Sequence, residues 1–409
     1  MAIAVTGRLR TSAFPAEVWI VSISTFLSRS VGFLALFSTA FYKSIGLGAA
    51  TLTLALFTAG FAGVLGSLAG GWAATRFGST DVLIAGSVLN IPLLFLLGPL
   101  SARPAAAIVV ASVSVAVTQS FAGPAAALVT GSGYEGNTVT IVAFHRIFLS
   151  TGVTVAPIVV ALVGADNFSA LFYLSSSGSL MTAVLLLRER ARLRAAEGRA
   201  AVREHPADVV SRPPAIAGPG VHKTRLWAVI LVFGTAMAVY SQSLSGIPLS
   251  VERISGGAHL YGVLIVVNSV FIIAFEMPLS YLTSTLRWNY ALGLGIFLAG
   301  AGLAICGVGA SWPVCISGFA LFSLGEAIFI PQAGAAIAKL STASENPRYQ
   351  GCLSAAQALG FAVGPGIGAF GVLHDRAVFW AAVVQISLAA GAIAAVAGIN
   401  ENRSPHRVG

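Results

Sequence analysis

Four ionisable residues interrupt long apolar stretches of this sequence: Arg29, Arg146, Glu276 and Glu326. If these stretches cross a membrane, a charge at the centre costs about 2.5–3.5 kcal/mol, and residues kept at that cost usually serve a function. A carboxyl group removed from water holds a proton more readily, so it can bind and release protons near neutral pH. We therefore interpret the two glutamates as candidate proton-coupling residues, and we group the two arginines with them.

The two glutamates differ in their surroundings. Glu326 lies near the middle of its apolar stretch, whereas Glu276 lies in the cytoplasmic half of its own and directly precedes Met277-Pro278. The proline frees a backbone carbonyl one turn earlier and permits a bend. Asn268, eight residues before Glu276, is about two helical turns away and falls on a nearby face. For each glutamate, the alternative is a structural pair with a neighbouring helix.

The two arginines leave more than one interpretation open. Arg29 lies close to the centre of its apolar stretch, so its side chain should face a cavity or a carboxylate. Anion recognition and an ion pair are both consistent with that position. Arg146 follows His145 near the start of a stretch, where it either takes part in coupling or reaches the cytoplasmic surface.

Several uncharged side chains in the same stretches are candidates for lining a substrate cavity. Such a cavity needs aromatic surface together with a few amide or hydroxyl groups. The candidates are Gln119, Asn268, Tyr240, Gln242, Phe33 and Phe37. For each of them the alternative is packing between helices.

The composition shows why these residues must be considered in a membrane. The chain has 409 residues, of which 56% are hydrophobic and 9% are charged, whereas soluble proteins carry about 25% charged residues. This excludes a single soluble domain, a disordered chain and a nucleic-acid-binding domain. In a membrane protein, a net charge of +9 usually reflects cytoplasmic loops that are rich in Lys and Arg.

Twelve segments are apolar over the length of about 20 residues that a membrane-spanning helix needs. They are residues 16–41, 49–74, 81–100, 105–130, 138–164, 168–187, 226–250, 259–284, 289–309, 312–338, 350–373 and 377–399. The predicted fold is therefore all-α and integral to the membrane, with twelve transmembrane helices.

One connection, residues 188–225, is long and contains nine Lys and Arg residues. Its arginine-rich start is compatible with an extension of the sixth helix, and its Pro- and Gly-rich remainder is typical of a flexible linker. It divides the chain into an N-terminal six-helix bundle (1–187), a cytoplasmic linker (188–225), and a C-terminal six-helix bundle with a short tail (226–409).

The basic residues also predict the orientation of the chain. With the N-terminus inside, the cytoplasmic side holds 17 of the 23 Lys and Arg residues, and the outer side holds Lys43, Arg103, Arg253 and Arg376. This asymmetry satisfies the positive-inside rule. We expect both termini in the cytoplasm of a bacterial-type inner membrane, with some basic residues in contact with anionic lipids.

Two proline landmarks recur at almost the same offset, near half the chain length. They are Pro124 and Pro331, 207 residues apart, and Pro157 and Pro365, 208 residues apart, the latter two preceded by Gly152 and Gly360. This indicates two pseudo-symmetric bundles related by an axis along the membrane normal, with a site between them. At the offset of 207, the counterpart of Glu326 is Gln119.

The connection between the second and third segments reads Gly70-Gly71-Trp72-Ala73-Ala74-Thr75-Arg76-Phe77-Gly78-Ser79-Thr80-Asp81. It resembles the loop motif of the major facilitator superfamily, roughly G-x-L-A-D-R-x-G-R-R. Thr75 stands where the motif has Asp, and Ser79-Thr80 stand where it has a basic pair. The resemblance implies the major facilitator fold and a gating loop, formed here by Gly71, Arg76, Gly78 and Asp81, with fewer charges than usual.

Later segments resemble the twelve-helix drug:proton antiporters of this superfamily. The shared features are Arg348-Tyr349-Gln350-Gly351 and Gly364-Pro365-Gly366 in the eleventh segment, Gly325-Glu326 with Pro331 in the tenth, and Gly152 to Pro157 in the fifth. The resemblance implies antiport and a monomer. Gly152, Pro157, Gly360 and Pro365 are the candidate helix-bend residues, because Gly permits close helix packing and Pro permits bending.

Motifs for other chemistry do not occur in the sequence. It has no P-loop, no G-x-S-x-G elbow and no metal-binding histidine cluster, and its three cysteines lack metal-ligand spacing. We therefore expect no enzyme activity, no catalytic residues, no cofactor and no metal.

Together these features predict a secondary transporter that exports a small hydrophobic or amphipathic compound, coupled to protons, by alternating access. The expected partners are the small-molecule substrate, protons and membrane lipids, and no nucleic acid. One alternative is a proton symporter or exchanger that imports an organic anion or sugar through contacts with Arg29 and Arg146. Another is a non-transporting sensor or assembly partner, which only the depleted loop favours.

Overall fold

The structure is a computed structural model that describes residues 14–132, 134, 137–164, 167–203, 219–254 and 257–397. Within these ranges it consists of helices and connections, without strands. Ten of the described helical segments are long and apolar enough to cross a membrane. The first predicted segment is additionally present as two shorter helices, and the last two predicted segments are joined in one long helix, so all twelve are accounted for.

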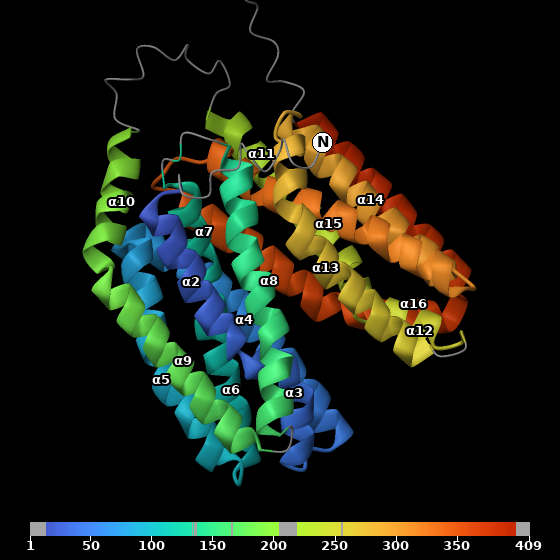
Figure 1. Cartoon of the computed structure of the whole chain (residues 1–409), viewed down its shortest axis with the longest axis horizontal. Helices are drawn as coiled ribbons and strands as arrows, with labels where there is room; N and C mark the ends of the chain where they lie inside the picture. The colour runs from blue at the N-terminus through green and yellow to red at the C-terminus, as the bar shows by residue number, and fades with distance from the viewer. Residues whose placement is uncertain are drawn as a thin grey trace, which may run out of the picture. The chain divides into compact units, whose positions relative to one another are not determined.

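The first six predicted segments are found close to their expected positions (Figure 1). They are α2 (Ala16–Ser30) with α3 (Phe33–Ser44), α4 (Ala49–Phe77), α5 (Ser79–Leu100), α6 (Pro104–Gln119) with α7 (Ala122–Thr130), α8 (Thr138–Val163) and α9 (Phe168–Arg188). Two of these segments, the first and the fourth, are broken where the sequence predicted continuous helices.

Each break has a local cause. At the first, Gly32 follows Val31, and the Val31 carbonyl accepts hydrogen bonds from Ser175 Oγ at 2.5 Å and from Phe33 N, only two residues on, at 2.9 Å. At the second, Pro124 has no N–H group to donate to the carbonyl of Ser120, four residues earlier, and the helix is interrupted at that residue.

The second six segments follow the same order. They are α11 (Pro219–Tyr240) with η2 (Ser241–Ser243) and α12 (Gly246–Val251), α13 (Gly257–Thr283), α14 (Trp288–Val308), α15 (Trp312–Leu340) and α16 (Asn346–Ala397). Pro248 removes the donor to Leu244 and accompanies the break before α12. In α16, Asp375 has non-helical φ/ψ of −151° and 99°, and its Oδ1 accepts from Val378 N at 3.0 Å, so it ends one helix and caps the next.

The chain divides into two compact units. The first unit comprises residues 1–202 and 343–362, and the second comprises 203–342 and 363–409. The first part of α16 therefore packs with the N-terminal helices, and the remainder packs with the C-terminal ones. The domain boundaries expected from the sequence, on either side of a linker at 188–225, remain a prediction.

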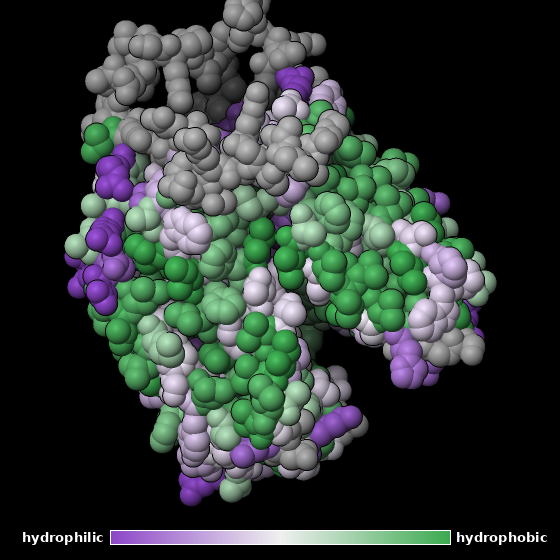
Figure 2. Space-filling model, in the orientation of Figure 1, coloured by the Kyte–Doolittle hydropathy of each residue, from purple (hydrophilic) through white to green (hydrophobic). Residues whose placement is uncertain are grey.

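The outer faces of the helices carry large apolar side chains. Phe57, Leu162 and Phe370 expose 62%, 82% and 65% of their surface, which would be unfavourable in water but suits contact with lipid. Figure 2 shows these apolar (green) surfaces over both units, with hydrophilic (purple) residues gathered on α10 and at helix ends.

In the second unit, α14 and α15 run antiparallel and pack through glycines. A Cβ atom at Gly295 would lie 2.8 Å from both Cβ and N of Phe329 and 3.0 Å from the Gly325 carbonyl oxygen. Only glycine leaves room for this approach. Small residues allow such close helix contact where the membrane supplies no hydrophobic driving force between helices.

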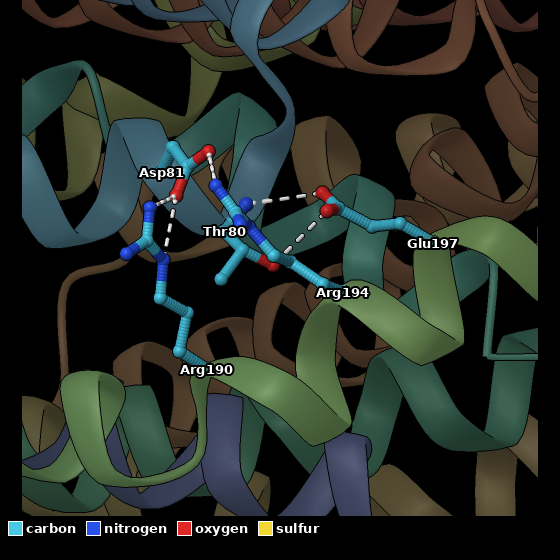
Figure 3. A network of polar contacts seen from close by, with 5 residues as sticks. All are labelled: Thr80, Asp81, Arg190, Arg194 and Glu197. Carbon is cyan, nitrogen blue, oxygen red and sulfur yellow. Dashed lines mark hydrogen bonds and ion pairs between the residues drawn. The ribbon is translucent and has the colours of Figure 1, made fainter.

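A separate helix, α10 (Arg190–Arg203), follows α9 after Glu189, whose φ/ψ of −95° and 7° ends the sixth segment. The arginine-rich segment is thus not a straight extension of that helix. Arg190 and Arg194 both pair with Asp81, at 2.9 and 2.6 Å (Figure 3).

The helix α10 also supplies hydrogen-bond acceptors to the first turn of α5. Glu197 accepts hydrogen bonds from Thr80 N at 3.0 Å and from Thr80 Oγ1 at 3.1 Å (Figure 3). The amides of a first helical turn have no partner within the helix, and the N-terminal end of the helix dipole favours a negative charge. The connection between α4 and α5 has Ser79-Thr80 in place of the usual basic pair. Its charged partners, Arg190, Arg194 and Glu197, come from α10.

We predict that Glu197→Ala weakens the start of α5, because the Thr80 amide loses its acceptor. Loss of a helix cap costs about 0.5–2 kcal/mol, so amides 79–82 should exchange hydrogen faster in the purified protein, as measured by mass spectrometry. Glu189→Ala is the matched control, because Glu189 pairs with Arg192 within the same segment. Unchanged exchange in Glu197→Ala would contradict this role of α10.

We also predict that Gly295→Ala lowers the midpoint of thermal unfolding in detergent, because the added methyl group overpacks the interface between α14 and α15. Overpacking typically costs about 1–3 kcal/mol. Gly262→Ala is the control, since a Cβ at Gly262 in α13 meets nothing within 4 Å. Equal midpoints for the two variants would show that the glycine contact is not needed.

Candidate functional site

Three helices of the second unit meet at the Glu326 carboxylate. Asn268 Nδ2 on α13 donates to Glu326 Oε2 at 2.8 Å, and the Tyr240 hydroxyl at the end of α11 donates to Oε1 at 3.3 Å. Asn268 Nδ2 also donates to Ser323 Oγ at 3.0 Å. The sequence singled out Glu326, Asn268 and Tyr240 separately, and the structure brings them together.

The carboxylate is shielded from solvent, with Glu326 4% exposed and Ser323 fully buried. Hydrogen bonds to a charged group contribute about 1.5–3 kcal/mol each, so the Asn268 and Tyr240 bonds offset a membrane cost of about 2.5–3.5 kcal/mol. The Tyr240 ring packs against Phe322 with centroids 5.2 Å apart. The Glu326 cluster, meaning Glu326, Asn268, Tyr240 and Ser323, is thus a polar group beside an aromatic surface.

Ser323 was not identified from the sequence. It lies three residues before Glu326, and residues at this spacing share one helix face, so this spacing was the available signal.

A second polar group, in the first unit, was also not identified from the sequence. There Ser114 Oγ donates to Asn90 Oδ1 at 2.7 Å, and Asn90 Nδ2 donates to Thr118 Oγ1 at 3.2 Å.

Glu276 is fully buried in α13. The sequence placed Asn268 on a face near it, yet Asn268 donates to Ser323 and Glu326 rather than to Glu276. Glu276 is therefore a second buried carboxylate outside the hydrogen bonds that Asn268 makes.

Gln242 lies at the break between α11 and α12 and is 3% exposed. Its Nε2 donates at 2.9 Å to the carbonyl oxygens of Ala238 and Gly364, and its Oε1 accepts from Ser245 Oγ at 3.2 Å. These bonds connect the break to the backbone of α11 at Ala238 and of α16 at Gly364. A role for Gln242 in lining a cavity remains a prediction.

The other cavity candidates lie in the first unit. Phe33 is 2% exposed in an apolar cluster with Ala156, and Phe37 packs against this cluster. Gln119 is the last residue of α6. It lies close to Gly63, where an added Cβ atom would be 3.3 Å from Gln119 Cγ. Phe33 is thus part of the packed core, and contact with a substrate remains a prediction for all three candidates.

Arg29 lies in the last turn of α2, immediately before the break at Val31 and Gly32. Its guanidinium forms no hydrogen bond or ion pair with any residue that the structure describes, whereas its backbone carbonyl accepts from Gly32 N at 3.2 Å. The helix dipole stabilises a cation there by about 0.3–1 kcal/mol. This is smaller than the membrane cost of about 2.5–3.5 kcal/mol, so a further negative partner is expected.

His145 and Arg146 lie on α8, beside α2. Ser22 Oγ lies 3.2 Å from His145 Nδ1. Further along α8, a Cβ at Gly152 would lie 2.8 Å from Arg29 Cβ, so Gly152 permits the close approach of the two helices. Pro157 lies within α8, and Gly360 and Pro365 lie within α16. Their role in bending remains a prediction.

The residues of the predicted gating loop surround the join between α4 and α5. Gly78 has φ of +91° and links the two helices, Arg76 lies 5.7 Å from the Trp72 ring centroid, and Asp81 pairs with α10. The positive φ explains the glycine at position 78, since other residues rarely adopt it.

Gly71 lies where α16 approaches α4 within the first unit. A Cβ atom at Gly71 would lie 2.8 Å from the Pro347 carbonyl oxygen and 2.9 Å from Gly351 Cα.

Within the described ranges, no three His, Cys, Asp or Glu side chains group as metal ligands.

Comparison with known proteins gives the same fold. The family model described as Major Facilitator Superfamily matches residues 18–256 and 231–408. Solved structures are also similar. The human organic anion transporter MFSD10 (TETRAN) has a TM-score of 0.67 and 16% identity, over 93% of this chain and 100% of that chain. The proton:xylose symporter XylE, bound to 6-bromo-6-deoxy-D-glucose, has a TM-score of 0.65 and 13% identity, over 93% of this chain and 94% of that chain.

FucP in its outward conformation has a TM-score of 0.65 and 13% identity, over 94% of this chain and 98% of that chain. No curated protein sequence matches the chain significantly. Likeness at these identities shows the fold alone, whereas the family match covers most of the chain. Together with the apolar helices, it shows that this integral membrane protein belongs to the Major Facilitator Superfamily, a family of transporters.

Proposed function

We propose that this chain is a proton-coupled secondary transporter in which Glu326 binds and releases the coupling proton. The observation that carries the proposal is the burial of the Glu326 carboxylate among side chains from two other helices. Glu276, fully buried in α13, is the second candidate for this role. With no nucleotide-binding motif in the sequence, an ion gradient supplies the energy.

The Glu326 cluster can satisfy both protonation states. When the carboxylate is ionised, Oε2 accepts from Asn268 and Oε1 accepts from Tyr240. An amide N–H can only donate, but a hydroxyl group can rotate and accept. The proton therefore enters at Oε1, where the Tyr240 hydroxyl turns from donor to acceptor, while Asn268 keeps its bond to Oε2.

The transported compound is small and hydrophobic or amphipathic, because the Tyr240 and Phe322 rings lie beside the carboxylate. Export in exchange for protons follows from the resemblance of the fifth, tenth and eleventh segments to antiporters. The distribution of basic residues supports a bacterial-type inner membrane with both termini in the cytoplasm. We expect a monomer that works by alternating access, with Arg146 near the coupling path.

We predict that expression of this chain in efflux-deficient bacteria lowers accumulation of at least one of three dyes: cationic ethidium, neutral Nile red or anionic carboxyfluorescein. A protonophore should abolish the effect, and so should Glu326→Gln, which keeps the shape but cannot ionise. Glu252→Gln is the control, because Glu252 is exposed after α12. The proposal fails if Glu326→Gln and Glu276→Gln both leave protonophore-sensitive accumulation unchanged.

We further predict an order of severity within the cluster. Asn268→Leu removes donated bonds to two side chains, so initial transport rates in vesicles should fall about tenfold or more. Tyr240→Phe removes one longer bond and keeps the ring contact with Phe322, so the loss should be smaller, about two- to tenfold. Equal rates in both variants and the native chain would exclude the cluster from transport.

A further inference from the structure

A groove lies in the second unit where α11 begins and α16 ends. Its volume is about 540 Å³, within the range of about 300–1,000 Å³ that is usual for ligand sites. Its walls include Arg225 and Ala228 of α11, and Ala392, Ile393, Val396 and Ala397 of α16. Three of these residues are alanines, whose short side chains leave space open between the two helices.

The α16 wall of the groove is held in place through another face of that helix. Asn289 Nδ2, at the start of α14, donates to the Ala395 carbonyl oxygen at 2.6 Å. One turn later, a Cβ atom at Gly293 would lie 2.5 Å from the Gly391 carbonyl oxygen. Gly391 and Ala395 are themselves one turn apart and therefore share the face toward α14. The groove is thus built into the packing of the unit, so a ligand can enter it without a costly rearrangement.

The groove has an apolar part and a polar end. Ile393 and Val396 are large apolar residues that remain exposed, which suits contact with acyl chains. Trp227, two residues after Arg225, is also exposed, and tryptophan favours the interface between membrane and water. Arg225 therefore lies near the level of the lipid headgroups, and the α16 residues border the acyl chains.

The polar end of the groove carries positive charge. Arg225 lines the groove and is only 8% exposed, and it forms no hydrogen bond or ion pair with any residue that the structure describes. Lys223, two residues earlier, is exposed, and among the described residues no Asp or Glu lines the groove. Because a buried guanidinium without a partner is unfavourable, this end of the groove suits an anion.

From this juxtaposition we propose that the groove binds an anionic phospholipid of the cytoplasmic leaflet. Arg225 pairs with the phosphate diester, Lys223 adds long-range attraction, and one acyl chain lies along Ala392 and Val396. A guanidinium group presents paired N–H donors that match two phosphate oxygens. The distribution of basic residues predicts that α11 begins on the cytoplasmic side, where anionic lipids are attracted to basic pockets between helices.

The test measures lipid binding to the purified, delipidated full chain in detergent, by native mass spectrometry. Phosphatidylglycerol is compared with phosphatidylcholine that has the same acyl chains but no net charge. We expect phosphatidylglycerol to bind about tenfold or more tightly. Arg225→Gln should remove this preference. Arg192→Gln is the matched control and should keep it, because Arg192 is exposed on α10, where it pairs with Glu189.

A second pair of variants tests the apolar part of the groove. Ala392→Phe fills the groove, so it should weaken binding of phosphatidylglycerol about tenfold or more. Ala381→Phe should bind as the native chain does, because Ala381 is exposed on α16 about three turns earlier. Since Ala392 is also exposed, the added ring can be placed without disturbing the fold.

Three results overturn the lipid site. The first is equal binding of the two lipids by the native chain. The second is a preference that persists in Arg225→Gln, or, if that variant does not fold, native binding by Ala392→Phe. The third is displacement of phosphatidylglycerol by an excess of glycerophosphoglycerol, which has the same headgroup without acyl chains, because it would indicate a site for soluble anions. Lipid binding is measured here without transport, so it is independent of the proposed proton coupling.

Discussion

In the apolar interior of a membrane, each backbone polar group and each charge needs a partner within the protein. Continuous helices meet this need for the backbone, and the broken segments need extra donors. Ser175 supplies one to the Val31 carbonyl beside the break in the first segment. Gln242 supplies one each to the Ala238 and Gly364 carbonyls beside the break in the seventh. Side-chain donors thus bond backbone carbonyls beside both interruptions.

The same constraint separates the charged residues into three groups. The Glu326 carboxylate receives donors from two other helices, so it is accommodated inside its own unit. The Asp81 carboxylate at the start of α5 is paired by α10. The Arg29 guanidinium makes neither kind of contact within the described ranges. The partner that a charge finds therefore depends on which elements pack beside it.

The two halves of the chain have the same order of helices but differ in the residues at corresponding positions. In both halves the first segment is broken, before α3 and before α12. Arg29 lies just before the first break, and Gln242 lies within the second. The position of Glu326 is occupied by Gln119 at the repeat offset of 207, so only one half carries a carboxylate there. The sequence repeat thus predicts an acid in one half and an uncharged amide at the corresponding position of the other.

The sequence alone determined the number, order and approximate limits of the membrane helices, because about 20 apolar residues in a row leave few other folds open. It also identified Glu326 and Arg29 as unusual, since the cost of a charge depends mainly on its depth in an apolar stretch. It could not decide their partners. Asn268 was expected near Glu276, two turns along the same helix, yet it bonds to Glu326 on another helix. The function of Glu197 also emerged only in the fold, where α10 brings it to Thr80. Apolar length is a local property of the chain, whereas the contacts of a side chain depend on which helices pack together and at what rotation, and only the tertiary structure decides that.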